Sequence, residues 1–172
     1  IHLLVNHNEH VSIYSQIASK LGIANKKNKI VQKPTSFINN NSSDEKVDVV
    51  IVDEAHLLLT QGKQSYQGKN HLDDLLARAK VVVIVFDIKQ VLTTEQIWEV
   101  DKLNEYFDKA KSNSNHVTLR NQMRINSDIS TVNWIRNLVD YQVINSIPKD
   151  KLGYDIKIFD TPDELEKAIK IK

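Results

Sequence analysis

The sequence contains no cysteine and no long apolar run. A chain without cysteine forms no disulfides and offers no thiolate to a metal ion. A membrane-spanning helix needs about 18 or more apolar residues. The opening residues, "IHLLVNHNEH", lack the basic start and the long apolar region of a signal peptide. We therefore expect neither a membrane segment nor a secretory leader, but a soluble globular protein of the reducing cytoplasm.

Glycine is scarce, with only four in 172 residues, whereas an average protein has ~7%. A phosphate loop, G-x-x-x-x-G-K-[ST], needs backbone N–H groups that wrap the phosphates and a hydroxyl that reaches magnesium. The nearest match, Gly62 with Gly68 and Lys69, has one residue too many between its glycines, and Asn70 replaces the Ser or Thr. It also follows an acidic strand that it should precede. We therefore reject it as a phosphate loop.

Neither sign of charge dominates the chain. The 23 Lys and Arg residues against 22 Asp and Glu residues give a net charge of +1, so a nucleic-acid surface would have to be a local patch. His7 and His10 lie close in sequence, but no H-E-x-x-H motif or Cys/His cluster accompanies them, and zinc is not expected. A chain of this length holds one core, or one core and the beginning of a second.

Short apolar runs alternate with helical patterns, which is typical of an α/β sheet. Two runs, "VDVVIVD" and "KVVVIVFD", are almost continuously apolar and are predicted to be central parallel strands covered on both faces. The polar stretch from residue 25 to 46 is expected to hold a short strand and a turn. The expected strands are Ile1–Asn6, Val47–Asp53, Lys80–Asp87, His116–Leu119 and Asp155–Phe159, and apolar periodicity or capping motifs predict helices beginning near Val11, Thr93, Ile125 and Thr161. The last of these helices has an apolar face, with Leu165 and Ile169, that nothing later in the sequence could cover.

Asp53 and Glu54 close one of these strands, in the stretch "VVIVDEAH". Ligands bind beyond the carboxyl ends of parallel strands. An Asp there can hold magnesium, usually through water, while a neighbouring Glu can polarise an attacking water. A bare acidic pair more often caps a helix. The β-branched residues before this pair and the "AH" after it favour nucleotide chemistry.

Three motifs in order resemble the core of superfamily 1-type helicases. They are "VDEAH", "FDIKQVL" and "LRNQMR". More narrowly, the chain from about Ile1 to Ile169 is similar to a bacterial group of P-loop ATPases, the Schlafen-type DNA/RNA helicase domains. The resemblance implies a RecA-like P-loop NTPase fold with a parallel sheet flanked by helices. It also implies ATP and magnesium as cofactors of the parent protein, although none is expected on this fragment.

The resemblance assigns roles to five residues. Asp53 would hold magnesium and Glu54 would be the catalytic base. Asp87 and Gln90 would belong to a motif that couples the γ-phosphate to nucleic acid, although Phe86 stands where that motif usually has Gly. Arg124 would reach the γ-phosphate as an arginine finger. Two alternatives stay open: Gln90 could cap a loop, and Arg124 could pair with Asp128 at helical spacing.

Two segments are candidates for binding nucleic acid, which in helicases of this type runs as a single strand across the tops of the domains. The turn "NHNEH", with Asn6 and His7, is positioned like motif Ia. The loop "QGKQSYQGKN" offers Lys63 and Lys69 for phosphates and Tyr66 for stacking on a base, although it could equally be a solvated loop. Trp98 and Trp134 lie in helical patterns and are expected to pack in cores.

The resemblance implies that residues 1–125 are a first RecA-like domain that lacks its phosphate-loop strand, and that residues 126–172 begin a second. The phosphate loop would then precede Ile1, and the chain would be truncated at both ends. The parent would be an ATP-dependent DNA or RNA helicase or translocase, and this fragment alone would be almost inactive. Two alternatives remain: a P-loop ATPase that remodels or signals in defence without unwinding, and a non-enzymatic nucleic-acid-binding module.

Overall fold

The computed structural model describes residues 1–25, 29–63, 65–90, 96, 98–119 and 123–171. The chain divides into two compact units, residues 1–116 and 117–172. Within the described part, no helix is both long and apolar enough to cross a membrane. The assignment of the two units to two RecA-like domains stays a prediction.

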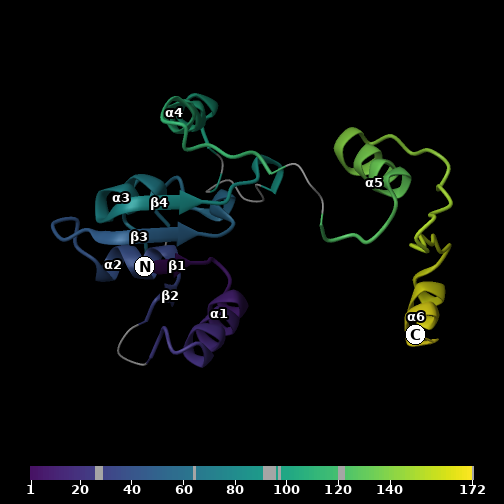
Figure 1. Ribbon diagram of the computed structural model, residues 1–172, viewed down its shortest axis with the longest axis horizontal. Helices are drawn as coiled ribbons and strands as arrows, with labels where there is room; N and C mark the ends of the chain where they lie inside the picture. Colours follow the sequence, from purple (N-terminus) through teal and green to yellow (C-terminus); the bar gives the residue numbers. More distant parts are fainter. Residues whose placement is uncertain (26–28, 64, 91–95, 97, 120–122, 172) are drawn as a thin grey trace. The chain divides into compact units, whose positions relative to one another are not determined.

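The first unit is built on a four-stranded parallel sheet. Its strands are β1 (His2–Leu4), β2 (Val31–Gln32), β3 (Val47–Val52) and β4 (Ala79–Ile84), in the spatial order β2-β1-β3-β4. In the register of the sheet Leu4 pairs with Val52, and Val52 pairs with Ile84. Because all strands are parallel, the carboxyl ends of β1, β3 and β4 lie along one edge of the sheet (Figure 1). The predicted α/β fold, a parallel sheet flanked by helices, is confirmed and is consistent with a RecA-like arrangement.

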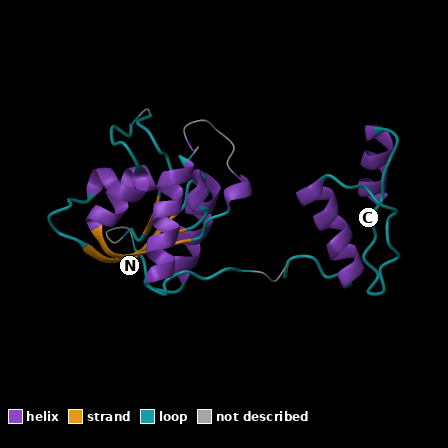
Figure 2. Cartoon of the chain, turned by 90° about the horizontal axis from the view of Figure 1, so that it is seen from above, coloured by secondary structure: helices purple, strands orange, loops and turns teal. Residues whose placement is uncertain are grey.

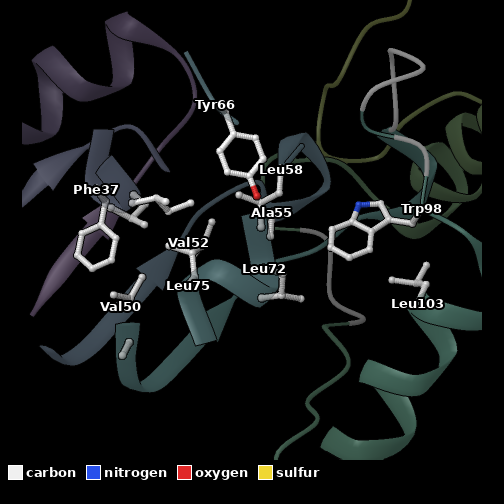
Figure 3. Close-up of a cluster of buried hydrophobic side chains, with 13 residues drawn as sticks. Phe37, Val50, Val52, Ala55, Leu58, Tyr66, Leu72, Leu75, Trp98 and Leu103 are labelled. Carbon is white, nitrogen blue, oxygen red and sulfur yellow. The ribbon is translucent and has the colours of Figure 1, made fainter. Parts of the chain in front are cut away.

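Helices flank the strands of this unit (Figure 2). They are α1 (Asn8–Lys20), α2 (Pro34–Asn40), α3 (His71–Arg78) and α4 (Val100–Ser112), with short 3-10 helices η1 (Ala55–Leu57) and η2 (Ile88–Gln90). Successive strand residues point to opposite faces, so Leu4 joins the larger core cluster while Val5 joins a smaller one with Ala18 of α1. The larger cluster includes residues of α2, α3 and α4, among them Phe37, Leu75 and Leu103 (Figure 3). The sheet therefore has buried apolar residues on both faces.

The strand β4 lies at an edge of this sheet, whereas its sequence predicted a central strand. Val81, Val83 and Val85 alternate along one face and are 51%, 47% and 48% exposed. Among the described residues, therefore, that face is only partly covered. β3 is central, as predicted, because it pairs with β1 on one side and with β4 on the other.

The second unit contains α5 (Ile129–Tyr141) and α6 (Pro162–Ile171). The Asp128 carboxylate accepts from the backbone N–H groups of Ser130 and Thr131 and so caps α5. Asp150 accepts from the hydroxyl of Thr131 at 2.6 Å and from the N–H of Asp128 at 2.9 Å. The loop after α5 is thereby tied to the beginning of that helix. At α6 the N–H of Glu164 donates to Thr161 Oγ1, as the capping motif predicted.

Three local predictions need correction. His116–Leu119 and Asp155–Phe159 form no strand, because a strand needs a neighbour with which to pair its backbone groups and neither segment has one among the described residues. After the acidic pair the chain forms only the short 3-10 helix η1 (Ala55–Leu57). α4 begins at Val100, and its predicted capping box falls on Thr93–Glu95, which lie outside the described residues.

Candidate functional site

The predicted polar residues gather where β1, β3 and β4 end. Asn6 and His7 follow β1, Asp53 and Glu54 follow β3, and Asp87 follows β4. Backbone hydrogen bonds continue past the strands and hold these segments together: Asp53 N–H donates to Leu4 O at 3.0 Å, and Ala55 N–H donates to Val85 O at 2.7 Å. The sheet thus places three segments that are distant in sequence along one edge, where parallel sheets bind ligands.

Glu54 adopts a left-handed backbone conformation, with φ 51° and ψ 50°. This conformation costs a residue with a Cβ of the order of 1 kcal/mol or more. Strain of this kind concentrates at functional sites. The N–H of Glu54 donates to Oδ1 of Asp53 at 3.0 Å, so the two acids are also fixed relative to each other.

His7 lies beside Glu54, with 3.9 Å between Nε2 of the histidine and Oε2 of the glutamate. Both side chains are partly exposed at the edge of the sheet. The ring of His7 also contacts the ring of His10 in an edge-to-face arrangement, at 5.5 Å between centroids. A residue predicted to touch nucleic acid is therefore in direct contact with the residue predicted to be the catalytic base.

His56 is a site residue that the sequence interpretation did not single out. Its side chain is buried, and its Nδ1 accepts the backbone N–H of Asp87 at 3.4 Å. Its ring meets the ring of Phe86 edge to face at 6.3 Å between centroids. His56 therefore joins the loop after β3 to the loop after β4. The signal in the sequence was one polar residue inside the apolar run "AHLLL".

Asp87 and Gln90 form a small hydrogen-bonded loop. The Gln90 side-chain amide donates to Asp87 Oδ2 at 2.7 Å, and the backbone N–H of Lys89 donates to Oδ1 at 3.0 Å. The Lys89 N–H lowers the pKa of Asp87, and the Gln90 amide adds to this effect. The hydrogen bond from Gln90 to Asp87 is the contact expected if Gln90 caps a loop. Its role toward a γ-phosphate stays a prediction, as does the role of Asp87.

A hairpin from Gly62 to Lys69, hereafter the lysine hairpin, carries Lys63, Tyr66 and Lys69. Backbone N–H groups of Lys63 and Tyr66 donate to each other's carbonyl oxygens. The Tyr66 side chain is only 2% exposed, its hydroxyl donates to Asp74 Oδ2 at 2.6 Å, and its ring packs on His71. Burial is the main cause that raises the pKa of Tyr66. The structure therefore does not support Tyr66 as a stacking platform, because its ring is buried in the core.

The two lysines of this hairpin are exposed, and their phosphate contacts stay a prediction. Behind the hairpin, His71 Nδ1 accepts the Leu59 N–H, while His71 Nε2 lies 3.1 Å from Thr35 Oγ1. Burial lowers the pKa of His71 to about 4. His71 is thus a neutral structural residue that fixes the base of the hairpin.

Arg124 belongs to the second unit and is exposed. The preceding motif residues, 120–122, lie outside the described part of the chain. The predicted contact between Arg124 and a γ-phosphate stays a prediction. Among the described residues no group of three or more His, Asp or Glu side chains could hold a metal ion by itself. A magnesium ion held by one carboxylate and by phosphate oxygens needs no such group.

Comparison with known proteins adds an independent finding. The family model described as Schlafen group 3, DNA/RNA helicase domain, matches residues 1–172. An uncharacterized protein of Saccharomyces cerevisiae is 32% identical over 195 residues, which cover 99% of this chain and 42% of the yeast protein. The chain thus spans less than half of that relative's length. No solved structure matches it.

Proposed function

The chain belongs to the Schlafen group 3 DNA/RNA helicase domain family, and we propose that it carries the magnesium-binding and general-base carboxylates of an ATP-dependent helicase or translocase. The observation that carries this proposal is the arrangement of polar residues at the edge where β3 and β4 end. There Asp53 and Glu54 are joined to the Asp87–Gln90 loop through His56. The proposed activity, substrate and partners are those of the whole protein.

The residue types at this edge are those that a magnesium–nucleotide complex needs. Asp53 would hold the ion through water, which is the usual role of an acid at the end of such a strand. The ion would neutralise charge on the phosphates. Glu54 would accept a proton from the attacking water, and its fixed backbone would orient its carboxylate toward that water. The phosphate loop that this chemistry needs does not occur in residues 1–172.

His56 and Gln90 would report the state of the nucleotide. A shift of Asp53 or Glu54 would move the loop after β3, and the hydrogen bond from Asp87 to His56 would carry that movement to the loop after β4. Nucleic acid would contact Asn6, His7, Lys63 and Lys69. Arg124 would reach the γ-phosphate as an arginine finger. DNA or RNA is thus the proposed partner.

The test uses the polypeptide encoded by the complete gene. ATP hydrolysis should require magnesium and should rise when single-stranded nucleic acid is added. Glu54→Gln, which removes the base but keeps the shape, should lower the hydrolysis rate by about 100-fold or more, while Glu45→Gln, an exposed glutamate before β3, should leave it unchanged. Hydrolysis without strand displacement would identify a remodelling or signalling ATPase. Nucleic-acid binding without any hydrolysis would identify a binding module and overturn the enzymatic proposal.

A further inference from the structure

His7 stands at the beginning of α1, but its side chain does not serve that helix. It occupies the N-cap position, with an extended backbone (φ −86°, ψ 138°), and its side chain makes no hydrogen bond to the helix. N-cap positions favour Ser, Thr, Asp and Asn, whose side-chain oxygens pair with the first N–H groups of a helix. The imidazole of His7 is therefore available for a role outside α1.

The contact that this imidazole does make is with the carboxylate of Glu54. Nε2 of His7 lies 3.9 Å from Oε2 of Glu54, and among the described residues no other side chain pairs with that carboxylate. A carboxylate only accepts, so the imidazole nitrogen that donates to it must carry a proton. The distance exceeds a normal hydrogen bond by about 1 Å, and a rotation of either side chain would close the gap. His7 is thus placed to orient the proposed catalytic base.

The sheet brings the two residues together from neighbouring strands. The ends of β1 and β3 are joined where Asp53 N–H donates to Leu4 O at 3.0 Å. The left-handed backbone of Glu54 and its N–H bond to Asp53 set the direction in which the carboxylate leaves the chain. His7 therefore reaches Glu54 from the side of β1, whereas Gln90 follows β4, on the other side of β3.

The contact between His7 and Glu54 is open to solvent and can therefore be exchanged. The His7 side chain is 56% exposed and that of Glu54 is 38% exposed. Exposed pairs of this kind contribute little stability, because water and salt screen them. A phosphate group of nucleic acid is also an anionic acceptor. It can thus replace the carboxylate as the partner of the imidazole.

We propose that His7 is a positioning residue for the base: it holds the Glu54 carboxylate away from the attacking water until a phosphate of bound nucleic acid takes the place of that carboxylate. This inference rests on the proposed function, in which His7 contacts nucleic acid and Glu54 is the base. It adds a control of hydrolysis that reaches the acidic pair from β1. Because both partners share His7, the coupling is reciprocal, and freeing His7 from Glu54 also strengthens its hold on nucleic acid.

The reciprocal coupling gives a test that needs no hydrolysis. Binding of the polypeptide of the complete gene to labelled single-stranded DNA and to single-stranded RNA of the same sequence is measured without ATP or magnesium. Glu54→Gln removes the competing charge and should tighten binding about threefold more than the control Glu9→Gln, an exposed acid in the first turn of α1. In a His7→Ser background, Glu54→Gln should do no more than the control. Serine is a good N-cap residue, so this background should keep α1 folded.

Hydrolysis by the same polypeptide gives the second readout. At saturating ATP, His7→Ser should raise the rate without nucleic acid about threefold, leave the KM for ATP unchanged, and reduce the stimulation by saturating nucleic acid by a similar factor. His7→Gln, whose amide nitrogen can donate from about the position of Nε2, should behave like the unmodified protein. Gln16→Ala is the control and should change neither rate, because this side chain lies exposed on α1 and donates to Ser12 of the same helix.

An equal effect of Glu54→Gln on binding in both backgrounds, with normal stimulation in His7→Ser, would overturn the role of His7 and leave the proposed function in place. Rates that fall in His7→Ser with and without nucleic acid, and that His7→Gln does not restore, would also overturn it, because they would assign His7 a structural role. Failure of the unmodified protein both to bind nucleic acid and to hydrolyse ATP would overturn the inference and the proposed function together.

Discussion

The backbone N–H of Asp87 donates to Nδ1 of the buried His56 at 3.4 Å, and this bond joins the loops that follow two neighbouring parallel strands. Because Nδ1 accepts, the proton of a neutral His56 ring is on Nε2. The ring also contacts Phe86, which in turn meets Trp98 at 5.8 Å between centroids. Ring contacts therefore connect His56, in the loop after β3, with Trp98, which precedes α4.

The left-handed backbone of Glu54 should make the stability of variants at this position depend on whether the new residue tolerates it. Replacing it with Gly or with Ala removes the same carboxylate, but only Gly accepts φ 51° without strain. Glu54→Gly should therefore have a free energy of unfolding about 1 kcal/mol higher than Glu54→Ala. Chemical denaturation of residues 1–172 measures this difference. Equal stability of the two variants would mean that the left-handed conformation is not retained in solution.

His71 should make the first unit sensitive to mild acid. In the folded chain its pKa is lowered to about 4, whereas an unfolded histidine has its ordinary value of 6.5. The unfolded state therefore binds the proton more tightly. The stabilisation is complete above pH 6.5 and is lost as the pH falls from 6.5 toward 4, by about 3 kcal/mol in all.

Denaturation curves between pH 7 and pH 4 measure this loss. His71→Gln should lower stability at pH 7, because Leu59 N–H and Thr35 lose a well-placed partner. The informative quantity is the slope of unfolding free energy against pH, which should be flatter in the variant. An unchanged slope would assign the acid sensitivity to other groups.

Gly68 should be intolerant of any side chain. A Cβ at this position would lie 2.4 Å from both the Tyr66 hydroxyl oxygen and Asp74 Oδ2. Gly68→Ala must therefore break the hydrogen bond between these two side chains, and we expect a loss of about 1–3 kcal/mol of unfolding free energy. Gly62→Ala, in the same hairpin, places its Cβ at an ordinary 3.4 Å from its neighbours and should cost less. Thermal and urea unfolding of both variants provide the comparison, and equal losses would contradict the account of the hairpin.

Asp128 should control the helix content of the second unit. Its pKa is lowered to about 2, first by the Ser130 hydroxyl and then by the backbone N–H of Lys151. Asp128→Ala removes the cap of α5 and the contact to Lys151 together, so circular dichroism should show less helix and a lower thermal midpoint. Ser127→Ala, which leaves the cap intact, is the control. A normal spectrum for Asp128→Ala would show that α5 is held by packing alone.

The strands of the first unit could be predicted because burial leaves a direct trace in the sequence. The apolar run that became β3 is of this kind, whereas the run that became β4 predicted the strand but not its place at the edge of the sheet. The predictions failed where structure depends on a partner that is distant in sequence. His116–Leu119 has a strand-like composition, but the described part of the chain offers it no strand to pair with. The helix α2 lies in a stretch that looked too polar for more than a short strand and a turn.

The same limit applies to the site. Asp53, Glu54 and Asp87 could be placed at one edge because they come within three residues of the ends of two parallel strands, β3 and β4. Tyr66 could not be placed, because its burial depends on Asp74 and His71, and a loop composition gives no sign of those contacts. The bond from Asp87 to His56 likewise joins residues from two loops, which only the fold brings together.

The central claim is that Asp53 and Glu54 serve a bound magnesium–nucleotide complex. Measurements of ATP binding and hydrolysis by the polypeptide of the complete gene test this claim most directly. The unmodified protein should bind ATP in a magnesium-dependent way and hydrolyse it. Glu54→Gln should retain bound, unhydrolysed ATP, and Asp53→Asn should lose the magnesium dependence of binding. ATP binding and hydrolysis that are unchanged in both variants would contradict the claim.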